Sequence, residues 1–180
     1  WRPSPPILPR RRVIPTICVR SSWQTAAMGY RAAPDGWWQE FVGGEQVRTA
    51  KLAVTRLDGS PHVVPVWVDL ERGAGPDGDD VVVFMTSAET VKGRSILRDG
   101  RVALCWDDED PPFAFVTITG RATTSTDPDD LLDVGTRIGG RYMGVDQADA
   151  YGRRNAVPPE MVVRVVPTRI VAKVDVAGWE

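Results

Sequence analysis

Short runs of apolar and β-branched residues, several of them alternating with polar residues, recur along the chain from residue 49 onward. A period of two and this composition predict β-strands. The predicted strands span residues 49–56, 62–70, 81–86, 101–106, 113–124, 161–166 and 168–174. Asp58-Gly59 is a strong hairpin signal between the first two strands. Gly120 marks a bulge, Pro167 separates the last two strands, and residues 81–86 are apolar enough to be buried on both faces.

Three segments with helical spacing lie between these strands, at residues 35–42, 87–98 and 127–138. Asp35 and Asp127 are the expected N-caps of the first and third, and Gly-Gly pairs at 43–44 and 139–140 are expected to end them. Residues 142–156 are polar and predict a helix or a loop. Helices do not alternate with strands, so we expect an α+β fold: a small, mostly antiparallel barrel of six or seven strands with a few short helices.

Composition limits the classes of protein that remain. The chain has 180 residues, of which 42% are hydrophobic and 26% charged, and this balance is typical of one globular domain. No stretch approaches the roughly 20 apolar residues of a membrane helix. Two cysteines and one histidine exclude a disulfide scaffold and a His-rich zinc site. Catalysis would therefore depend on a bound cofactor, carboxylates or hydroxyl groups, and no metal site is expected.

The first 34 residues differ from the rest in charge, since they carry six arginines and no acidic residue. Together with the prolines of this region, the pattern predicts a disordered basic extension over residues 1–33, followed by a folded cofactor-binding domain over 34–180. We interpret residues 1–27 as an upstream extension, with the functional protein beginning near Met28. A targeting segment or a nucleic-acid-binding arm is the alternative. The remaining chain has 16 basic and 24 acidic residues, which argues against broad nucleic-acid binding.

The segment from residue 86 to residue 95 is the leading candidate for ligand binding. A buried strand ends at Thr86, and the helix that follows presents Lys92, Arg94 and Ser95 within four positions. Cations, hydroxyls and free backbone N–H groups at a helix start favour an anion, and phosphate suits them best. The alternative is a solvated helix face with ordinary charges.

Two further segments carry weaker signals. Pro65 lacks a backbone donor and Trp67 offers a flat surface, so residues 62–68 could hold a planar ligand; an edge strand with a core tryptophan is the alternative. The Gly-rich residues 139–144 follow a helix, not a strand, and fail the dinucleotide-binding fingerprint. Within them, Arg141 and Tyr142 are candidates for contact with a ligand or a second subunit, or belong to a structural loop.

The order of three segments resembles the split β-barrel proteins of the pyridoxamine 5′-phosphate oxidase class. The segments are RLDGSPHVVPVWVDL, VVVFMTSAETVKGRSILRDGRVALCW and FAFVTITGRATTSTDPDDL. The resemblance covers residues 37–174 and is strongest to the deazaflavin-dependent branch of actinobacteria. It implies a homodimer that binds coenzyme F420 or FMN in a groove between subunits.

The resemblance also implies which residues hold the cofactor. Met85, Thr86 and Lys92 correspond to the residues that hold the phosphate end of the cofactor, with Arg94 and Ser95 close by. The ring system lies against Val64, Pro65, Val66 and Trp67, and Arg141 and Tyr142 contribute from the late helix region. Val91 stands where the oxidase itself has arginine, and the oxidase's C-terminal Trp and Arg motif is absent, so oxidation of pyridoxamine phosphate is not expected.

The resulting hypothesis is a cytoplasmic oxidoreductase that transfers hydride from reduced coenzyme F420 to a small conjugated or electron-poor acceptor. The cofactor supplies the chemistry in such proteins, and we assign no catalytic side chain. The partners expected are a small-molecule substrate and a second copy of the chain, with neither nucleic acid nor membrane. The alternatives are an FMN-dependent oxidoreductase of the same fold and a non-catalytic protein that binds a flavin, a deazaflavin or haem.

Overall fold

The computed structural model describes residues 31–177. All but the last three residues of the predicted basic extension lie outside this range. Arg31–Ala32 form a short strand, β1, which was not predicted and which pairs antiparallel with the C-terminal strand.

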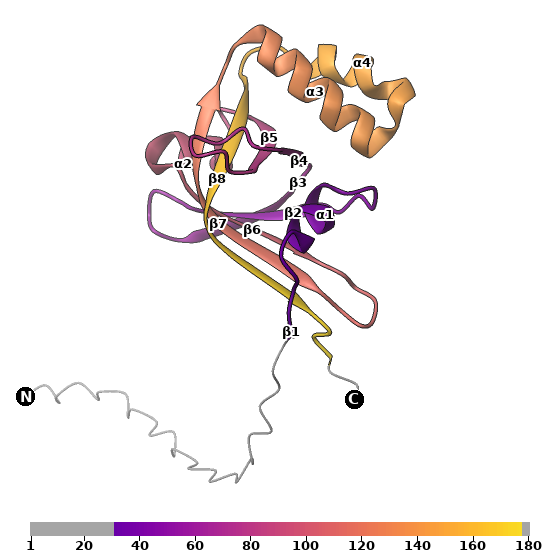
Figure 1. The fold of residues 1–180 in the computed structure, drawn as a ribbon. Helices are drawn as coiled ribbons and strands as arrows, with labels where there is room; N and C mark the ends of the chain where they lie inside the picture. The colour runs from indigo at the N-terminus through magenta and orange to yellow at the C-terminus, as the bar shows by residue number, and fades with distance from the viewer. Residues whose placement is uncertain (1–30, 178–180) are drawn as a thin grey trace, which may run out of the picture.

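The remaining strands form one continuous, strongly curved sheet (Figure 1). Their order across the sheet is β3-β2-β6-β7-β8-β5-β4, and every pairing among the described residues is antiparallel. The bounds are β2 Ala50–Thr55, β3 Pro61–Val66, β4 Asp69–Glu71, β5 Val81–Ser87, β6 Arg101–Asp107, β7 Phe115–Ser125 and β8 Glu160–Val174. The predicted α+β class with a mostly antiparallel sheet is confirmed.

Four helices accompany the sheet: α1 Trp37–Gly43, α2 Val91–Asp99, α3 Pro128–Met143 and α4 Val145–Asn155. Figure 1 shows α3 and α4 side by side at one end of the sheet, with α2 apart from them. Asp127 caps α3 as predicted, through its side chain and the amides of residues 129 and 130. Asp35 does not cap α1, because Gly36 occupies the N-cap position with a left-handed backbone.

Two strand boundaries differ from the prediction. Residues 62–70 do not form one strand, because pairing with β2 ends at Val66 and Asp69 begins β4, which pairs with β5. Conversely, β8 continues through Pro167. At this point Thr119 and Gly120 of β7 lie opposite Arg169 and Pro167, which leaves Thr168 as the extra residue of a bulge. An irregularity is therefore present at Gly120 as predicted, but the extra residue belongs to β8 and not to the strand that contains Gly120. The irregular register lets β8 continue past a residue that has no N–H.

The Gly139-Gly140 pair does not end α3, contrary to the prediction. The helix continues to Met143, because the glycines serve packing rather than termination. A Cβ on Gly139 would lie 2.7 Å from the Tyr151 Cβ, and one on Gly152 would lie 2.2 Å from the Thr136 Oγ1. Missing side chains on both helices thus let α3 and α4 approach closely, and α4 confirms the helical alternative for residues 142–156.

Burial divides the apolar interior into two clusters separated by β5. The larger lies inside the curved sheet and includes Trp106 and Phe84. The smaller lies under α3 and includes Val83 and Ile138. Because alternate residues of β5 enter different clusters, the strand is buried on both faces, as its uniform apolar sequence predicts. This arrangement places the end of β5 between the sheet and the α3–α4 pair.

Candidate functional site

A pocket of about 380 Å³ opens where β3, β5, α2, α3 and α4 meet, and we name it the Lys92 pocket. Its lining residues are Pro65, Val66, Trp67, Met85, Lys92, Ile138, Tyr151, Arg154 and Asn155. The first five are among the cofactor-binding residues predicted from the sequence. The structure thus brings together two segments, 65–67 and 85–92, that the sequence analysis singled out separately.

One wall of this pocket is the end of β3, the strand at one edge of the sheet. Trp67 lies just beyond it, 37% exposed, in the break before β4. Its ring stacks on Tyr142 with centroids 4.8 Å apart and an interplanar angle of 8°. The Tyr142 hydroxyl donates to the carbonyl of Arg48 at 2.9 Å and accepts from the Val68 amide at 3.0 Å. Tyr142 therefore supplies a hydrogen-bond partner where the strand ladder ends, and it holds Trp67 flat against the pocket.

From α2, Lys92 lines the pocket, and it lies in the first turn of this helix. Thr90 is its N-cap, and the Thr90 hydroxyl accepts from the Gly93 amide at 3.0 Å. Gly93 is required because a Cβ there would lie 2.2 Å from the Ser87 carbonyl oxygen. The amides of Val91 and Lys92 have no partner within the helix, as in any first turn. Half-buried Lys92 adds a full positive charge to this end, so this end favours an anion.

Other residues of the predicted anion site do not line the pocket. Thr86 and Ser95 are each 4% exposed, and the Thr86 hydroxyl lies 3.2 Å from that of Thr90. Arg94 is exposed and donates to the Glu89 carbonyl. Val64 packs against the larger apolar cluster. The hydroxyls of this segment thus organise the turn between β5 and α2.

Arg141 and Tyr142 also lie outside the pocket lining. The Arg141 guanidinium donates to the carbonyls of Val42 and Gly43, both at 3.0 Å, and so binds the C-terminal end of α1. Tyr142 contributes through its contact with Trp67. Arg141 thus connects the last turn of α3 to α1, and Tyr142 connects it to Arg48 and Val68.

Sequence reasoning missed three residues of α4 that line the pocket, namely Tyr151, Arg154 and Asn155. They are spaced at i, i+3 and i+4, which places them on one face of the helix. This spacing was available as a signal, but only the packing of α4 against α3 shows which face turns to the pocket. The Tyr151 ring also lies 5.7 Å from that of Trp67, in a tilted arrangement.

The electrostatics of the pocket combine two cations with one nearby acid. Burial raises the pKa of Glu160, and the Lys92 charge opposes that rise. Burial and then the Glu160 charge raise the pKa of Tyr151, while Arg154 acts in the opposite direction. Lys92 and Arg154 form no ion pair among the described residues. The pocket thus pairs an apolar, aromatic wall with two cations available to a ligand.

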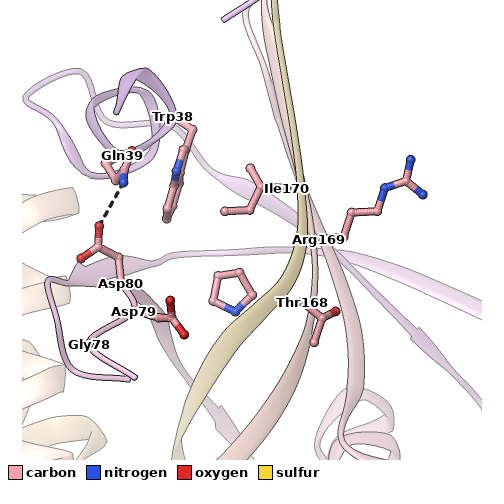
Figure 2. A pocket seen from close by; sticks show the side chains of 9 residues that line it. Trp38, Gln39, Gly78, Asp79, Asp80, Thr168, Arg169 and Ile170 are labelled. Carbon is pink, nitrogen blue, oxygen red and sulfur yellow. Dashed lines mark hydrogen bonds between the residues drawn. The ribbon is translucent and has the colours of Figure 1, made fainter. Parts of the chain in front are cut away.

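A second cavity, of about 460 Å³, lies between α1, the loop before β5 and the bulge of β8, and we name it the Asp80 pocket (Figure 2). The Asp80 carboxylate accepts from Gln39 Nε2 at 3.2 Å and from the Gly73 amide at 2.9 Å, and it pairs with Arg72 at 3.6 Å. In Figure 2 the Arg169 side chain extends away from the other lining residues. This pocket therefore presents the carboxylates of Asp79 and Asp80, and Asp80 already has hydrogen-bond partners. Its lining arginine, Arg169, does not point inward to bind a phosphate.

Two further properties concern the described residues alone. Among residues 31–177, no group of acidic, His and Cys side chains has the arrangement of a metal site. In the same range, no helix has the length and apolar character needed to cross a membrane.

The comparison with protein families identifies the class: residues 38–173 match the pyridoxamine 5′-phosphate oxidase family, and the chain belongs to it. The fold is accordingly the split β-barrel predicted from the sequence. A conserved hypothetical protein from Mycobacterium tuberculosis is similar to this chain, with 25% identity and a TM-score of 0.67 over 84% of this chain and 94% of the other. No curated protein sequence matches the chain.

Two other solved structures share the fold at lower identity. One, from Bacteroides thetaiotaomicron, is named as a candidate 5-nitroimidazole antibiotic resistance protein; identity is 18% and the TM-score 0.60, over 81% of this chain and 87% of the other. The second is named an F420 reductase, with 21% identity and a TM-score of 0.53 over 77% of this chain and 98% of the other. At these identities the likeness concerns the fold.

Proposed function

We propose that the protein is an oxidoreductase that binds coenzyme F420 in the Lys92 pocket and reduces a small conjugated or electron-poor acceptor. The observation that carries this proposal is the pocket itself, which is lined both by Lys92, in the first turn of α2, and by the exposed Trp67. A cofactor with an anionic end and a planar ring system suits both residues. Membership of the family and the fold shared with an F420 reductase support the choice of cofactor.

The residues of the chain have binding and positioning roles in this proposal. Lys92 and the free amides of its turn bind the anionic end. Trp67, held by Tyr142, and Met85 contact the ring system, and their apolar surfaces exclude water from it. When bound, reduced coenzyme F420 supplies the hydride. No side chain needs to act as nucleophile, which agrees with a pocket lined by cations, aromatics and aliphatic groups.

We further propose that two copies of the chain form the functional unit. The outer edge of β3 has no strand partner among the described residues, and Val63 on this edge is 61% exposed. A second copy covering this edge would also close the side of the pocket formed by residues 65–67. Sedimentation of the full chain should give twice the mass of one chain, and the mass of a single chain would contradict the dimer.

The proposed cofactor is tested by fluorescence titration of the full chain with coenzyme F420 and, separately, with FMN. Saturable binding of F420 at micromolar concentration or below is expected. Lys92→Ala should weaken it by about 1.5–3 kcal/mol, the range for hydrogen bonds to charged groups. Lys51→Ala is the matched control, because Lys51 pairs with Asp107 and is not among the residues that line this pocket.

Each outcome of this titration has a defined meaning. Preference for FMN would replace the deazaflavin by a flavin within the same pocket. Binding without turnover of any acceptor would make the protein a cofactor carrier. Equal affinity in wild type and Lys92→Ala would remove the Lys92 pocket from the account.

A further inference from the structure

Two cations line the Lys92 pocket, and they come from two different helices. Lys92 reaches it from α2, and Arg154 reaches it from α4, a separate element. Glu160 interacts electrostatically with Lys92 and with Tyr151, and Arg154 interacts with Tyr151. Glu160 thus interacts with both Lys92 and Tyr151, while the guanidinium of Arg154 has no ion pair among the described residues.

Arg154 has a second donor beside it. Tyr151 precedes it by three residues on the same face of α4, and both side chains line the pocket. The Tyr151 hydroxyl makes no hydrogen bond among residues 31–177, although its ring is held between Gly139 and Trp67. The neighbouring arginine, Arg153, does not line the pocket and pairs with Asp149 at 3.8 Å. The sequence thus contains two adjacent arginines, of which only one is available to a ligand in the pocket.

We propose that Tyr151 and Arg154 form a carboxylate-binding subsite, and that the acceptor of this protein is a planar conjugated carboxylic acid. A guanidinium and a phenolic O–H are both donors, and the fork of the guanidinium matches the two oxygens of a carboxylate. Ile138, an apolar residue of the same lining that the cofactor proposal does not use, suits a flat carbon skeleton. This inference rests on the proposed function in treating the bound acid as the acceptor of hydride. The subsite itself is formed by two side chains of α4.

The reaction that follows for such an acceptor balances without a further reactant. The β-carbon of a 2-enoate gains the hydride that the reduced cofactor supplies, and the α-carbon gains a proton from solvent. The carbon–carbon double bond becomes single, while the cofactor is oxidised by two electrons. A carboxylate held by Arg154 remains ionised throughout and serves to orient the double bond.

The subsite is tested first on full-chain protein without cofactor, by isothermal titration with trans-cinnamate and with its neutral isostere cinnamamide. The wild type should bind cinnamate about tenfold or more tightly than cinnamamide. Arg154→Gln should abolish this preference, Arg154→Lys should retain part of it, and Arg153→Gln should leave it unchanged. Tyr151→Phe should reduce it, and Lys92→Ala should reduce it less than Arg154→Gln does.

Three results would overturn the inference. They are equal binding of the two probes by wild type, equal effects of Arg153→Gln and Arg154→Gln, and a larger loss of the preference in Lys92→Ala than in Arg154→Gln. A thermal melt of each variant shows whether it is folded. Because no cofactor is present, this experiment can succeed even where the F420 titration fails, so the two proposals fail separately.

A second readout applies once turnover is measured with reduced cofactor. Arg154→Gln should raise the KM for cinnamate about tenfold while kcat changes by less than about twofold, because a binding contact is lost equally in ground and transition states. Unchanged KM with a reduced kcat would contradict the assignment of Arg154 to acceptor binding.

Discussion

The Lys92 pocket and the Asp80 pocket are of similar size and differ in what their charges contact. In the Asp80 pocket, the Asp80 carboxylate already binds Gln39, Gly73 and Arg72. In the Lys92 pocket, Lys92 and Arg154 line the cavity without an ion pair among the described residues. Paired charges stabilise the fold, whereas free charges on an apolar wall are available to a ligand. We therefore expect changes in the first pocket to alter stability and changes in the second to alter binding.

The largest effect on stability is expected from Asp80→Ala. The substitution leaves the Gly73 amide, the Gln39 amide and Arg72 without their acceptor, and hydrogen bonds to a charged group contribute about 1.5–3 kcal/mol each. We predict a loss of about 2–3 kcal/mol in the free energy of unfolding, measured by urea denaturation. Asp79→Ala is the control, since the exposed Asp79 side chain has no hydrogen bond or ion pair within residues 31–177. An equal loss in both variants would contradict the comparison.

The stability that Asp80 contributes should depend on pH. The Gly73 amide, with Gln39 and Arg72, holds the pKa of Asp80 below its ordinary value of 3.8, against the opposing effect of burial. A carboxyl whose pKa is lower in the folded state stabilises the protein above its unfolded pKa, and this contribution is lost as pH falls through the folded pKa. The difference in unfolding free energy between wild type and Asp80→Asn should therefore shrink below about pH 4. A constant difference down to acid pH would mean that the carboxylate charge is irrelevant.

A glycine pair tests the packing behind the Lys92 pocket. A Cβ on Gly139 would lie 2.7 Å from the Tyr151 Cβ, whereas one on Gly140 would lie 3.4 Å from the Ala148 Cβ, an ordinary contact. Gly139→Ala should therefore cost about 1–3 kcal/mol and displace Tyr151. Gly140→Ala should stabilise the protein by up to about 1 kcal/mol, because alanine is the better helix former. Thermal unfolding of the two variants compares them directly, and the opposite order would refute close packing of α3 on α4.

Tyr142→Phe should have a smaller effect on stability and a distinct effect on Trp67. Loss of the hydroxyl leaves the Val68 amide and the Arg48 carbonyl unpaired, at a cost of about 1–2 kcal/mol. Cofactor affinity should fall as well, because Trp67 loses its fixed position. Tyr151→Phe should leave stability within about 0.5 kcal/mol, the usual range for surface changes. If Tyr142→Phe changed stability alone, Tyr142 would be structural without positioning Trp67.

Several parts of the fold and the site could be predicted from the sequence because their signals are local. The alternation of apolar and polar residues, together with turn residues, predicted β2, β6 and β7. Asp127 was predicted as the N-cap of α3. The pocket segments at Pro65–Trp67 and Lys92 were found for the same reason, since an edge proline and a cation in a first helical turn act within their own element.

The remainder depended on contacts between distant residues. The Tyr142 hydroxyl bonds the Val68 amide across the β3–β4 break, and the bulge at Thr168 lets β8 continue beyond Pro167. The glycines of α3 look like helix breakers until α4 packs on them. Arg141 and Arg154 are both arginines on helices beside the pocket, yet one binds the carbonyls of α1 and the other lines the pocket. Only the tertiary structure distinguishes them.

Titration of coenzyme F420 into three full-chain proteins, wild type, Lys92→Ala and Asp80→Asn, separates the roles of the two pockets most directly. The separation of roles predicts that Lys92→Ala binds about tenfold or more weakly while unfolding within about 0.5 kcal/mol of wild type. Asp80→Asn should bind F420 as tightly as wild type while being less stable. Unchanged binding by Lys92→Ala together with lost binding by the folded Asp80→Asn would mean that the cofactor binds in the Asp80 pocket, which would contradict the proposed site.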